Sequence, residues 1–190
     1  GNRKIPNTTP HSKELTIAEV LKDAGYATAA IGKWHMAGDG EAPWDFAPPP
    51  LPPGKPGGKG PFKTELMPNA QGFDYFYGTP MHNGFTKEVD HRRFITELMR
   101  NEKVVQSPAN MDLLTKTYTE ETIEFIRAHQ DGPFFIYLAH SMPHTPLGAS
   151  EAFRGKSTRG LYGDAIEELD WSVGQILAEL KQLELDKNTL

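Results

Sequence analysis

Two short polar segments contain the residue types that could do chemistry. The first is Gly32-Lys33-Trp34-His35, and the second runs from His140 to Pro146 and includes His144. A lysine supplies a positive charge with three hydrogen-bond donors, and a histidine donates a hydrogen bond or transfers a proton near neutral pH. A lysine and two loop histidines around one pocket would attract a tetrahedral oxyanion. The same residue types also occur as solvated side chains at strand ends, so residue type alone leaves both interpretations open.

Both segments follow a predicted strand. Residues 26–32 are β-prone, and residues 133–139 are apolar throughout, which is typical of a central strand covered on both faces. Ligands of open α/β sheets bind beyond the carboxyl ends of the strands. Lys33 and His35 point to the same side if the backbone stays extended. We therefore expect Lys33, His35 and His144 to face one pocket.

The remaining pattern predicts an α/β chain with a largely parallel sheet. Thr16 and Glu19 form a capping-box pattern, and Gly25 stands where that helix would end. The other predicted elements are a strand or tight turn at 72–78, a hairpin at 96–106, and helices at 111–129 and 162–183. The acidic residues of the last helix are interpreted as its solvated face, and they are Asp164, Glu167, Glu168 and Asp170.

Residues 43–61 interrupt this pattern with eight prolines and four glycines. Each proline removes a backbone hydrogen-bond donor, which excludes a helix or a central strand. The segment is therefore expected to be an exposed, Pro/Gly-rich loop insertion with little regular structure.

Composition excludes several classes of protein. The chain has 190 residues, enough for one domain, and a net charge of -5, which argues against a nucleic-acid partner. No apolar run approaches the length of a membrane span, so no membrane partner is expected. There is no cysteine, and therefore no disulfide, zinc-thiolate site or cysteine nucleophile from this chain. Phosphate-loop, nucleophile-elbow and metalloprotease motifs are absent, and no metal ligand is predicted in the chain.

The segment from Gly25 to His35 resembles the second signature of the type I sulfatases. The segment at 71–78 resembles the next block of the same family. The segments at 133–146, 153–157 and 160–170 are similar to arylsulfatases of the arylsulfatase A and steroid-sulfatase kind. The resemblance covers nearly the whole chain apart from the Pro/Gly-rich loop. We therefore expect residues 1–190 to be an internal part of a sulfatase catalytic domain.

The resemblance implies an alkaline-phosphatase-like α/β fold, present as a partial domain with a largely parallel sheet flanked by helices. It also implies hydrolysis of a small-molecule or glycan sulfate ester by a formylglycine nucleophile, with a bound calcium ion, in an exported enzyme. By the same resemblance, Lys33 binds the sulfate and the formylglycine, and His35 hydrogen-bonds the formylglycine hydroxyl and helps eliminate sulfate. His144 contacts the substrate oxygen as a candidate acid. His82 stands where the family often places a serine and is a candidate substrate contact.

The formylglycine motif, Cys/Ser-x-Pro-x-Arg, is missing from the chain. The stretch Ser141-Met142-Pro143-His144-Thr145 comes nearest, but Thr145 stands where arginine is required. The nucleophile and the calcium ligands are therefore expected outside this chain, which alone should be inactive. Two alternatives stay open: a phosphoric or phosphonic ester hydrolase of the alkaline phosphatase superfamily, and a non-catalytic sulfatase-like domain that binds sulfated glycans.

Overall fold

Five strands form one mixed sheet in the order β4-β3-β2-β1-β5. The computed structural model describes residues 14–37, 64–81, 83 and 96–190, so the predicted loop at 43–61 and His82 lie outside the described residues. β1, β2 and β5 are parallel, and β3 and β4 add an antiparallel hairpin beside β2. The strands are β1 Ala27–Lys33, β2 Tyr75–Thr79, β3 Leu98–Arg100, β4 Lys103–Gln106 and β5 Phe134–Ala139.

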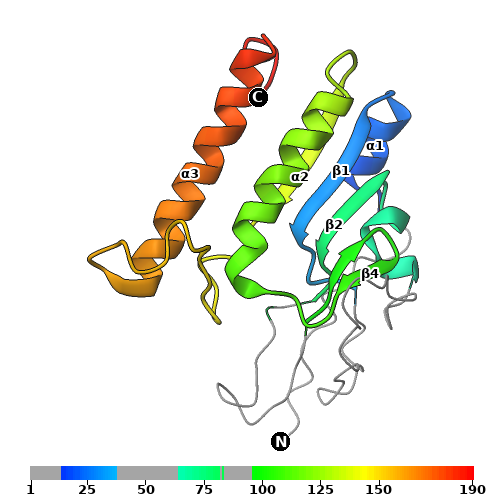
Figure 1. Cartoon of the computed structure of the whole chain (residues 1–190). Coiled ribbons are helices and arrows are strands. Elements are labelled where there is room, and N and C mark those ends of the chain that lie inside the picture. Colours follow the sequence, from blue (N-terminus) through cyan, green and yellow to red (C-terminus); the bar gives the residue numbers. More distant parts are fainter. Residues whose placement is uncertain (1–13, 38–63, 82, 84–95) are drawn as a thin grey trace, which may run out of the picture.

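Helices cover both faces of this sheet (Figure 1). The helices are α1 Ile17–Asp23, α2 Leu114–Ala128 and α3 Gly160–Gln182, with short 3-10 turns at Thr64–Leu66, Pro68–Ala70 and Met111–Leu113. α1 contributes Ala18 to the core on one face, and α2 contributes Leu114, Tyr118 and Phe125 to the core on the other. α3 packs against α2. The predicted α/β order and the hairpin are therefore confirmed, and no described helix is long and apolar enough to span a bilayer.

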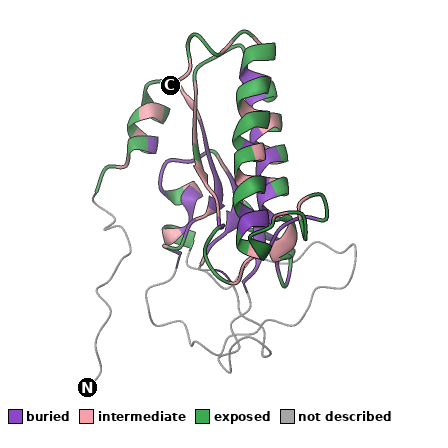
Figure 2. Cartoon of the chain, turned by 90° about the vertical axis from the view of Figure 1, so that its left-hand side faces the viewer, coloured by how far each residue is buried: buried purple, intermediate pink, exposed green. Residues whose placement is uncertain are grey.

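The prediction that residues 133–139 form a central strand covered on both faces is wrong for this chain. β5 lies at the edge of the sheet, and its side chains are only partly buried, with Tyr137 45% exposed. The apolar stripe of α3 is likewise open, since Leu177 is 60% exposed, and much of the helix surface is green in Figure 2. The sequence pattern indicates that these residues favour burial. Within the described part of the chain, however, β5 and the apolar stripe of α3 are only partly covered.

The predicted solvated acidic face of α3 is also wrong in part. Asp164 and Glu168 are buried, whereas Glu167 and Asp170 are exposed. The Asp164 carboxylate accepts hydrogen bonds from the backbone N–H groups of residues 155, 156 and 157, at 2.8, 3.1 and 2.8 Å. Glu168 accepts one from the backbone of Ser150 at 2.9 Å. These two carboxylates therefore hold the segment before α3 instead of facing water.

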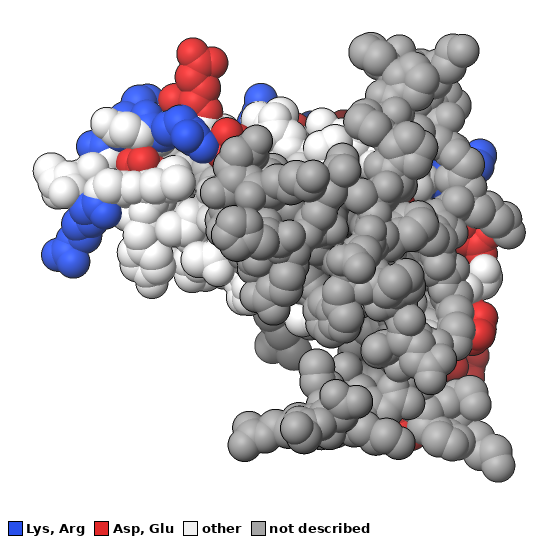
Figure 3. All heavy atoms as spheres, turned by 90° about the horizontal axis from the view of Figure 1, so that it is seen from below, with Lys and Arg blue, Asp and Glu red and all other residues white. Residues whose placement is uncertain are grey.

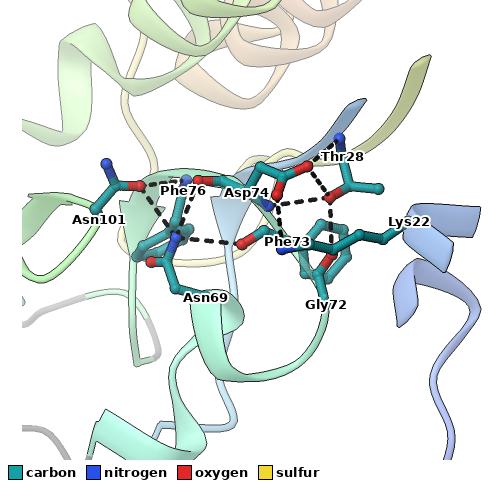
Figure 4. Close-up of polar contacts among 8 residues, drawn as sticks. All are labelled: Lys22, Thr28, Asn69, Gly72, Phe73, Asp74, Phe76 and Asn101. Carbon is teal, nitrogen blue, oxygen red and sulfur yellow. Dashed lines mark hydrogen bonds and ion pairs between the residues drawn. The ribbon is translucent and has the colours of Figure 1, made fainter. Parts of the chain in front are cut away.

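Side chains also fix the start of β2 against β1 (Figure 4). The Asp74 carboxylate accepts hydrogen bonds from the backbone N–H and the hydroxyl of Thr28, at 3.1 and 3.0 Å, and pairs with Lys22 Nζ at 2.6 Å. The Thr28 hydroxyl also lies 2.7 Å from the carbonyl oxygen of Gly72. Burial acts against the charged carboxylate, but the Lys22 and Thr28 contacts prevail and hold the pKa of Asp74 below its usual range.

The turn of the β3–β4 hairpin supports β2 from the other side. Asn101 occupies the left-handed region with φ of 51°, which asparagine tolerates better than most residues. Its side-chain oxygen accepts a hydrogen bond from the backbone N–H of Phe76 at 2.9 Å, and its own N–H donates to the Phe76 carbonyl at 2.7 Å. The turn thus continues the backbone pairing of β2 beyond the end of β3.

The carboxyl ends of the three parallel strands approach one another very closely. Gly32 of β1 lies in register with Gly78 of β2 and Ala139 of β5. A Cβ atom built on Gly78 would lie 1.7 Å from the carbonyl oxygen of Gly32, and one built on Gly32 would lie 2.0 Å from that of Ala139. Gly32 also has φ of 116°, which strains any residue with a side chain.

We predict that Gly78→Ala destabilises the chain by about 3 kcal/mol or more, because backbone atoms on a neighbouring strand cannot move aside as a side chain can. Gly174→Ala is the matched control, since a Cβ there meets nothing within 4 Å and the residue lies in α3. The control should leave stability unchanged or raise it by about 0.5–1 kcal/mol. Denaturant unfolding of the three proteins measures both effects, and equal stability of Gly78→Ala and the parent would contradict the close approach.

Candidate functional site

Three loops meet at the edge of the sheet where the parallel strands end. Lys33 is the last residue of β1 and is paired in register with Thr79, the last residue of β2. β5 ends one residue before His140, in register with Gly32. The polar segments at 33–35 and 140–146 therefore lie at the carboxyl ends of two strands, as the sequence predicts, and the structure makes these strands neighbours in the sheet.

Trp34 anchors the first of these loops. Its indole N–H donates to the carbonyl of Leu66 at 2.8 Å, and its backbone N–H donates to the carbonyl of Thr79 at 2.9 Å. Its ring packs edge-on against Phe73 with centroids 5.9 Å apart. The buried tryptophan holds the loop, so the residues on either side of it are positioned by packing.

The expectation that the Lys33 and His35 side chains point to the same side depends on an extended backbone, and the backbone is not extended at His35. β1 ends at Lys33, and His35 has φ of 64°, so the backbone does not stay extended. His35 is exposed and Lys33 is half-buried. The side on which His35 lies follows from this left-handed turn and not from strand alternation.

Lys33 combines partial burial with the lack of a carboxylate partner within the described residues. Burial lowers the pKa of the Lys33 amine below its ordinary value, because the charged form loses part of its hydration. A bound anion would replace that hydration, so this end of β1 can hold a negatively charged group.

Asn83 connects the loop after β2 with the loop after β5. Its side-chain amide donates to the carbonyl of His144 at 3.0 Å and lies 3.4 Å from that of Ser141. Asn83 is fully buried. Sequence reasoning missed it because a single asparagine in a loop carries no periodic or motif signal.

The His144 ring contacts a main-chain carbonyl through one nitrogen, which leaves the other nitrogen to contact a substrate. Nδ1 lies 2.5 Å from the carbonyl oxygen of Thr145, and since a carbonyl only accepts, Nδ1 carries the hydrogen. Nε2 is then the atom at which a proton is gained or lost. His144 is exposed, so a substrate oxygen can reach it.

His140 turns away from this edge and toward the helices. Its Nε2 lies 3.2 Å from the hydroxyl of Ser172 on α3, and its ring packs near Tyr118 of α2 at 6.3 Å. Its Nδ1 has no hydrogen-bond partner among the described residues. Burial lowers the pKa of His140 to about 4, so the ring is neutral at pH 7.

Basic side chains flank the carboxyl edge on one side. Arg154, Lys156 and Arg159 are exposed in the segment between β5 and α3, and Arg154 pairs with Asp112. Figure 3 shows lysine and arginine side chains gathered on that side of the molecule, in a view onto the lower edge of Figure 1. Acidic side chains lie among them, since Asp112 pairs with Arg154 and Glu151 is exposed in the same segment.

No group of three or more metal-ligating side chains occurs in the ranges that the structure describes.

A family model described as Sulfatase matches residues 2–190. The chain belongs to the sulfatase family. It is 33% identical to the steryl-sulfatase of Homo sapiens over 240 residues, covering 93% of this chain and 38% of that protein. It is 33% identical to the N-acetylgalactosamine-6-sulfatase of Mus musculus over 204 residues, covering 98% of this chain and 33% of that protein. The chain thus spans about a third of the length of these relatives.

Solved structures agree with the fold. The PsFucS1 sulfatase from Pseudoalteromonas sp. superposes with a TM-score of 0.68 and 23% identity, covering 91% of this chain and 36% of that one. Ps i-CgsB, solved in complex with k-i-k-neocarrahexaose, gives a TM-score of 0.64 and 26% identity, covering 94% of this chain and 39% of that one. The alkaline-phosphatase-like α/β fold predicted from the resemblance is confirmed for this chain.

We predict that His140 makes folding stability fall as the pH drops from about 6.5 to 4. The unfolded ring takes up a proton near pH 6.5 and the folded ring only near pH 4, so the unfolded state binds more protons in this window. The loss of folding stability is absent above this pH window, complete below it, and reaches about 3 kcal/mol. Denaturant unfolding of the parent and His140→Gln between pH 8 and 4 measures it.

The quantity to compare is the pH-dependent part of the difference between the two proteins, because all other titrating groups are shared. The stabilities of the parent and His140→Gln should converge or cross at low pH. A constant difference from pH 8 to 4 would mean that the His140 ring is hydrated.

Proposed function

We propose that this chain is part of a sulfatase catalytic domain and contributes cationic and proton-transferring groups to the hydrolysis of a sulfate ester. The observation that carries the proposal is the family match over residues 2–190, with Lys33 at the end of β1 and His144 beyond the end of the adjacent β5. Both positions lie at the edge where parallel α/β sheets bind ligands.

The role proposed for Lys33 is to bind the sulfate group. Cleavage of a sulfate ester builds negative charge on the leaving oxygen and retains it on the other sulfate oxygens. A partly desolvated ammonium group stabilises that charge more strongly than a hydrated one does. Lys33 ends a strand and lies beside the anchored Trp34. Its ammonium group therefore needs to move little during the reaction.

The role proposed for His144 is to donate a proton to the leaving oxygen. With Nδ1–H directed to the Thr145 carbonyl, a proton on Nε2 is the one available for transfer. His35 is proposed to hydrogen-bond the nucleophile from its position in the turn after Lys33. His82 is proposed as a further substrate contact, and its position lies outside the described residues.

The formylglycine nucleophile and calcium ion that the resemblance implies have no counterpart in the motifs of this sequence. When bound, such a cation would polarise the sulfate group. We propose that both belong to parts of the enzyme outside these 190 residues, and that the chain by itself has no turnover. The substrate proposed is a sulfate ester of a small molecule or a glycan.

Hydrolysis of paired aryl esters by the full-length polypeptide that contains this chain tests the proposal. A sulfatase should cleave 4-nitrophenyl sulfate with a kcat/KM well above that for 4-nitrophenyl phosphate. The reverse preference would support a phosphoric ester hydrolase. Retained binding of a sulfated glycan without turnover of either ester would support a non-catalytic domain.

We predict that Lys33→Ala in the full-length enzyme lowers kcat on 4-nitrophenyl sulfate about a hundred- to a thousand-fold. The loss follows from removing a fixed cation from a partly desolvated site. Lys187→Ala, at an exposed lysine near the end of the chain, is the control and should leave kcat unchanged. Thermal melts of the same proteins should agree within a few degrees, and unchanged turnover of a folded Lys33→Ala protein would reject the assignment.

A further inference from the structure

One turn of the main chain presents His144, the proposed proton donor, at the carboxyl edge of the sheet. The turn begins at Ser141, two residues beyond the end of β5, and the N–H of His144 donates to the Ser141 carbonyl at 3.2 Å. Ser141 is buried, whereas His144 is exposed. Because an exposed ring has little packing around it, the position of the His144 ring depends on the main chain that carries it.

Buried contacts fix the inner half of this turn. The Ser141 hydroxyl lies 3.4 Å from the hydroxyl of Tyr118 on α2. Met142 is buried, and its sulfur accepts the backbone N–H of Gly148 at 3.3 Å. These contacts hold residues 141 and 142, and the outer half of the turn, with His144, is held from another loop.

The side chain of Asn83 provides that second anchor. Asn83 lies four residues beyond Thr79, the last residue of β2, and is fully buried. Its amide nitrogen lies 3.0 Å from the carbonyl oxygen of His144 and 3.4 Å from that of Ser141. An amide NH2 group has two hydrogens to donate, so this one side chain holds both ends of the turn.

The contact at the His144 carbonyl also affects the direction of the ring. His144 Nδ1–H donates to the Thr145 carbonyl, which lies one peptide unit beyond the carbonyl that Asn83 holds. Since peptide units are planar, the two carbonyls can move relative to each other only through φ and ψ of Thr145. Asn83 therefore constrains where Nε2 of His144 points.

Asn83 reaches across the strand that carries Lys33. β2 and β5 lie on opposite sides of β1, and Lys33 ends β1. By contacting the His144 carbonyl, Asn83 joins the loop after β2 to the loop after β5. A shift of the His144 turn relative to the ends of these strands would break that contact.

We propose that Asn83 is a positioning residue, which holds the His144 turn so that Nε2 meets the leaving oxygen of the sulfate ester. This inference rests on the proposed function and assigns a role to a residue that does not itself touch the substrate. Displacing a catalytic group by about 1 Å can lower the rate about a hundredfold. Loss of the Asn83 contacts should therefore slow the step in which the leaving oxygen is protonated.

Leaving groups of different acidity report on that step. When the bond between sulfur and the leaving oxygen breaks, its electron pair goes to the oxygen, which takes the proton from Nε2 and departs as a neutral alcohol. 4-Nitrophenol is acidic enough to depart as its anion, whereas phenol is a weaker acid and gains more from protonation. The test therefore compares kcat/KM for 4-nitrophenyl sulfate and phenyl sulfate in the full-length enzyme.

Asn83→Leu removes both hydrogen bonds and keeps a similar side-chain volume. It should lower kcat/KM for phenyl sulfate about tenfold more than kcat/KM for 4-nitrophenyl sulfate, because only the former depends strongly on the proton. His144→Ala should show a selective loss at least as large. When Asn83→Leu is added to His144→Ala, both values should change by less than about twofold, because the group that Asn83 positions is already gone.

Asn69→Leu is the matched control. The Asn69 amide likewise donates to a main-chain carbonyl, that of Phe73 at 3.3 Å, but it does so just before β2 begins and not where β2 ends. The control should leave the ratio of the two kcat/KM values unchanged. Thermal melts check that each variant is folded, and Asn83→Ala takes the place of Asn83→Leu if the leucine variant does not fold. Failure of both variants to fold would give Asn83 a structural role and overturn the inference.

The outcomes separate this inference from the proposed function. If the parent hydrolyses neither ester, both are overturned. A uniform loss on the two esters in His144→Ala would overturn the role proposed for His144, and the positioning role with it. A selective loss in His144→Ala together with a uniform loss, or no loss, in Asn83→Leu would overturn the positioning role alone. A further full loss when Asn83→Leu is added to His144→Ala would do the same.

Discussion

The close approach of three backbones at Gly78, Gly32 and Ala139 is the constraint on which the candidate site depends. Because no Cβ intervenes between β1 and β2 at this level, the two strands end side by side, with Lys33 opposite Thr79. β5 ends on the other side of Gly32 at the same height. The loops that contain Lys33, Asn83 and His144 therefore leave the sheet from neighbouring points. A wider spacing would move the chain segments that carry Lys33 and His144 apart by the width of an added side chain.

Side-chain hydrogen bonds satisfy backbone groups that the short strands do not pair. Asp74 accepts the backbone N–H of Thr28 ahead of the β1–β2 ladder, and Asn101 accepts that of Phe76 beyond β3. The side-chain amide of Asn83 instead donates to the carbonyl of His144 in the loop beyond the sheet. Each of these contacts joins residues at least 25 positions apart in the sequence. Local patterning predicts strands and turns but has no access to such partners, so these three residues could not be identified in advance.

The sequence predicted the order of helices and strands, the hairpin at 96–106 and the polar segments at the ends of β1 and β5. It failed where burial depends on what lies beyond a residue's own element. Residues 133–139 are apolar enough for a central strand, yet β5 is an edge strand in the described sheet. Asp164 and Glu168 have the charge of a solvated face, yet both are buried and bind backbone N–H groups. Hydrophobicity measures a preference for burial, and hydrogen-bond partners decide the exceptions.

Electrostatics link the anchored β1 end to anion recognition. The chain has a net charge of -5, but Lys33 lies half-buried with no carboxylate partner among the described residues, and exposed basic residues follow β5. Because burial lowers the pKa of the Lys33 amine, that amine holds its proton less firmly than a surface lysine does. An anion beside the amine would raise that pKa again, so anion binding and proton uptake favour each other. A negatively charged group bound beside Lys33 would therefore offset the loss of hydration that burial imposes on the ammonium.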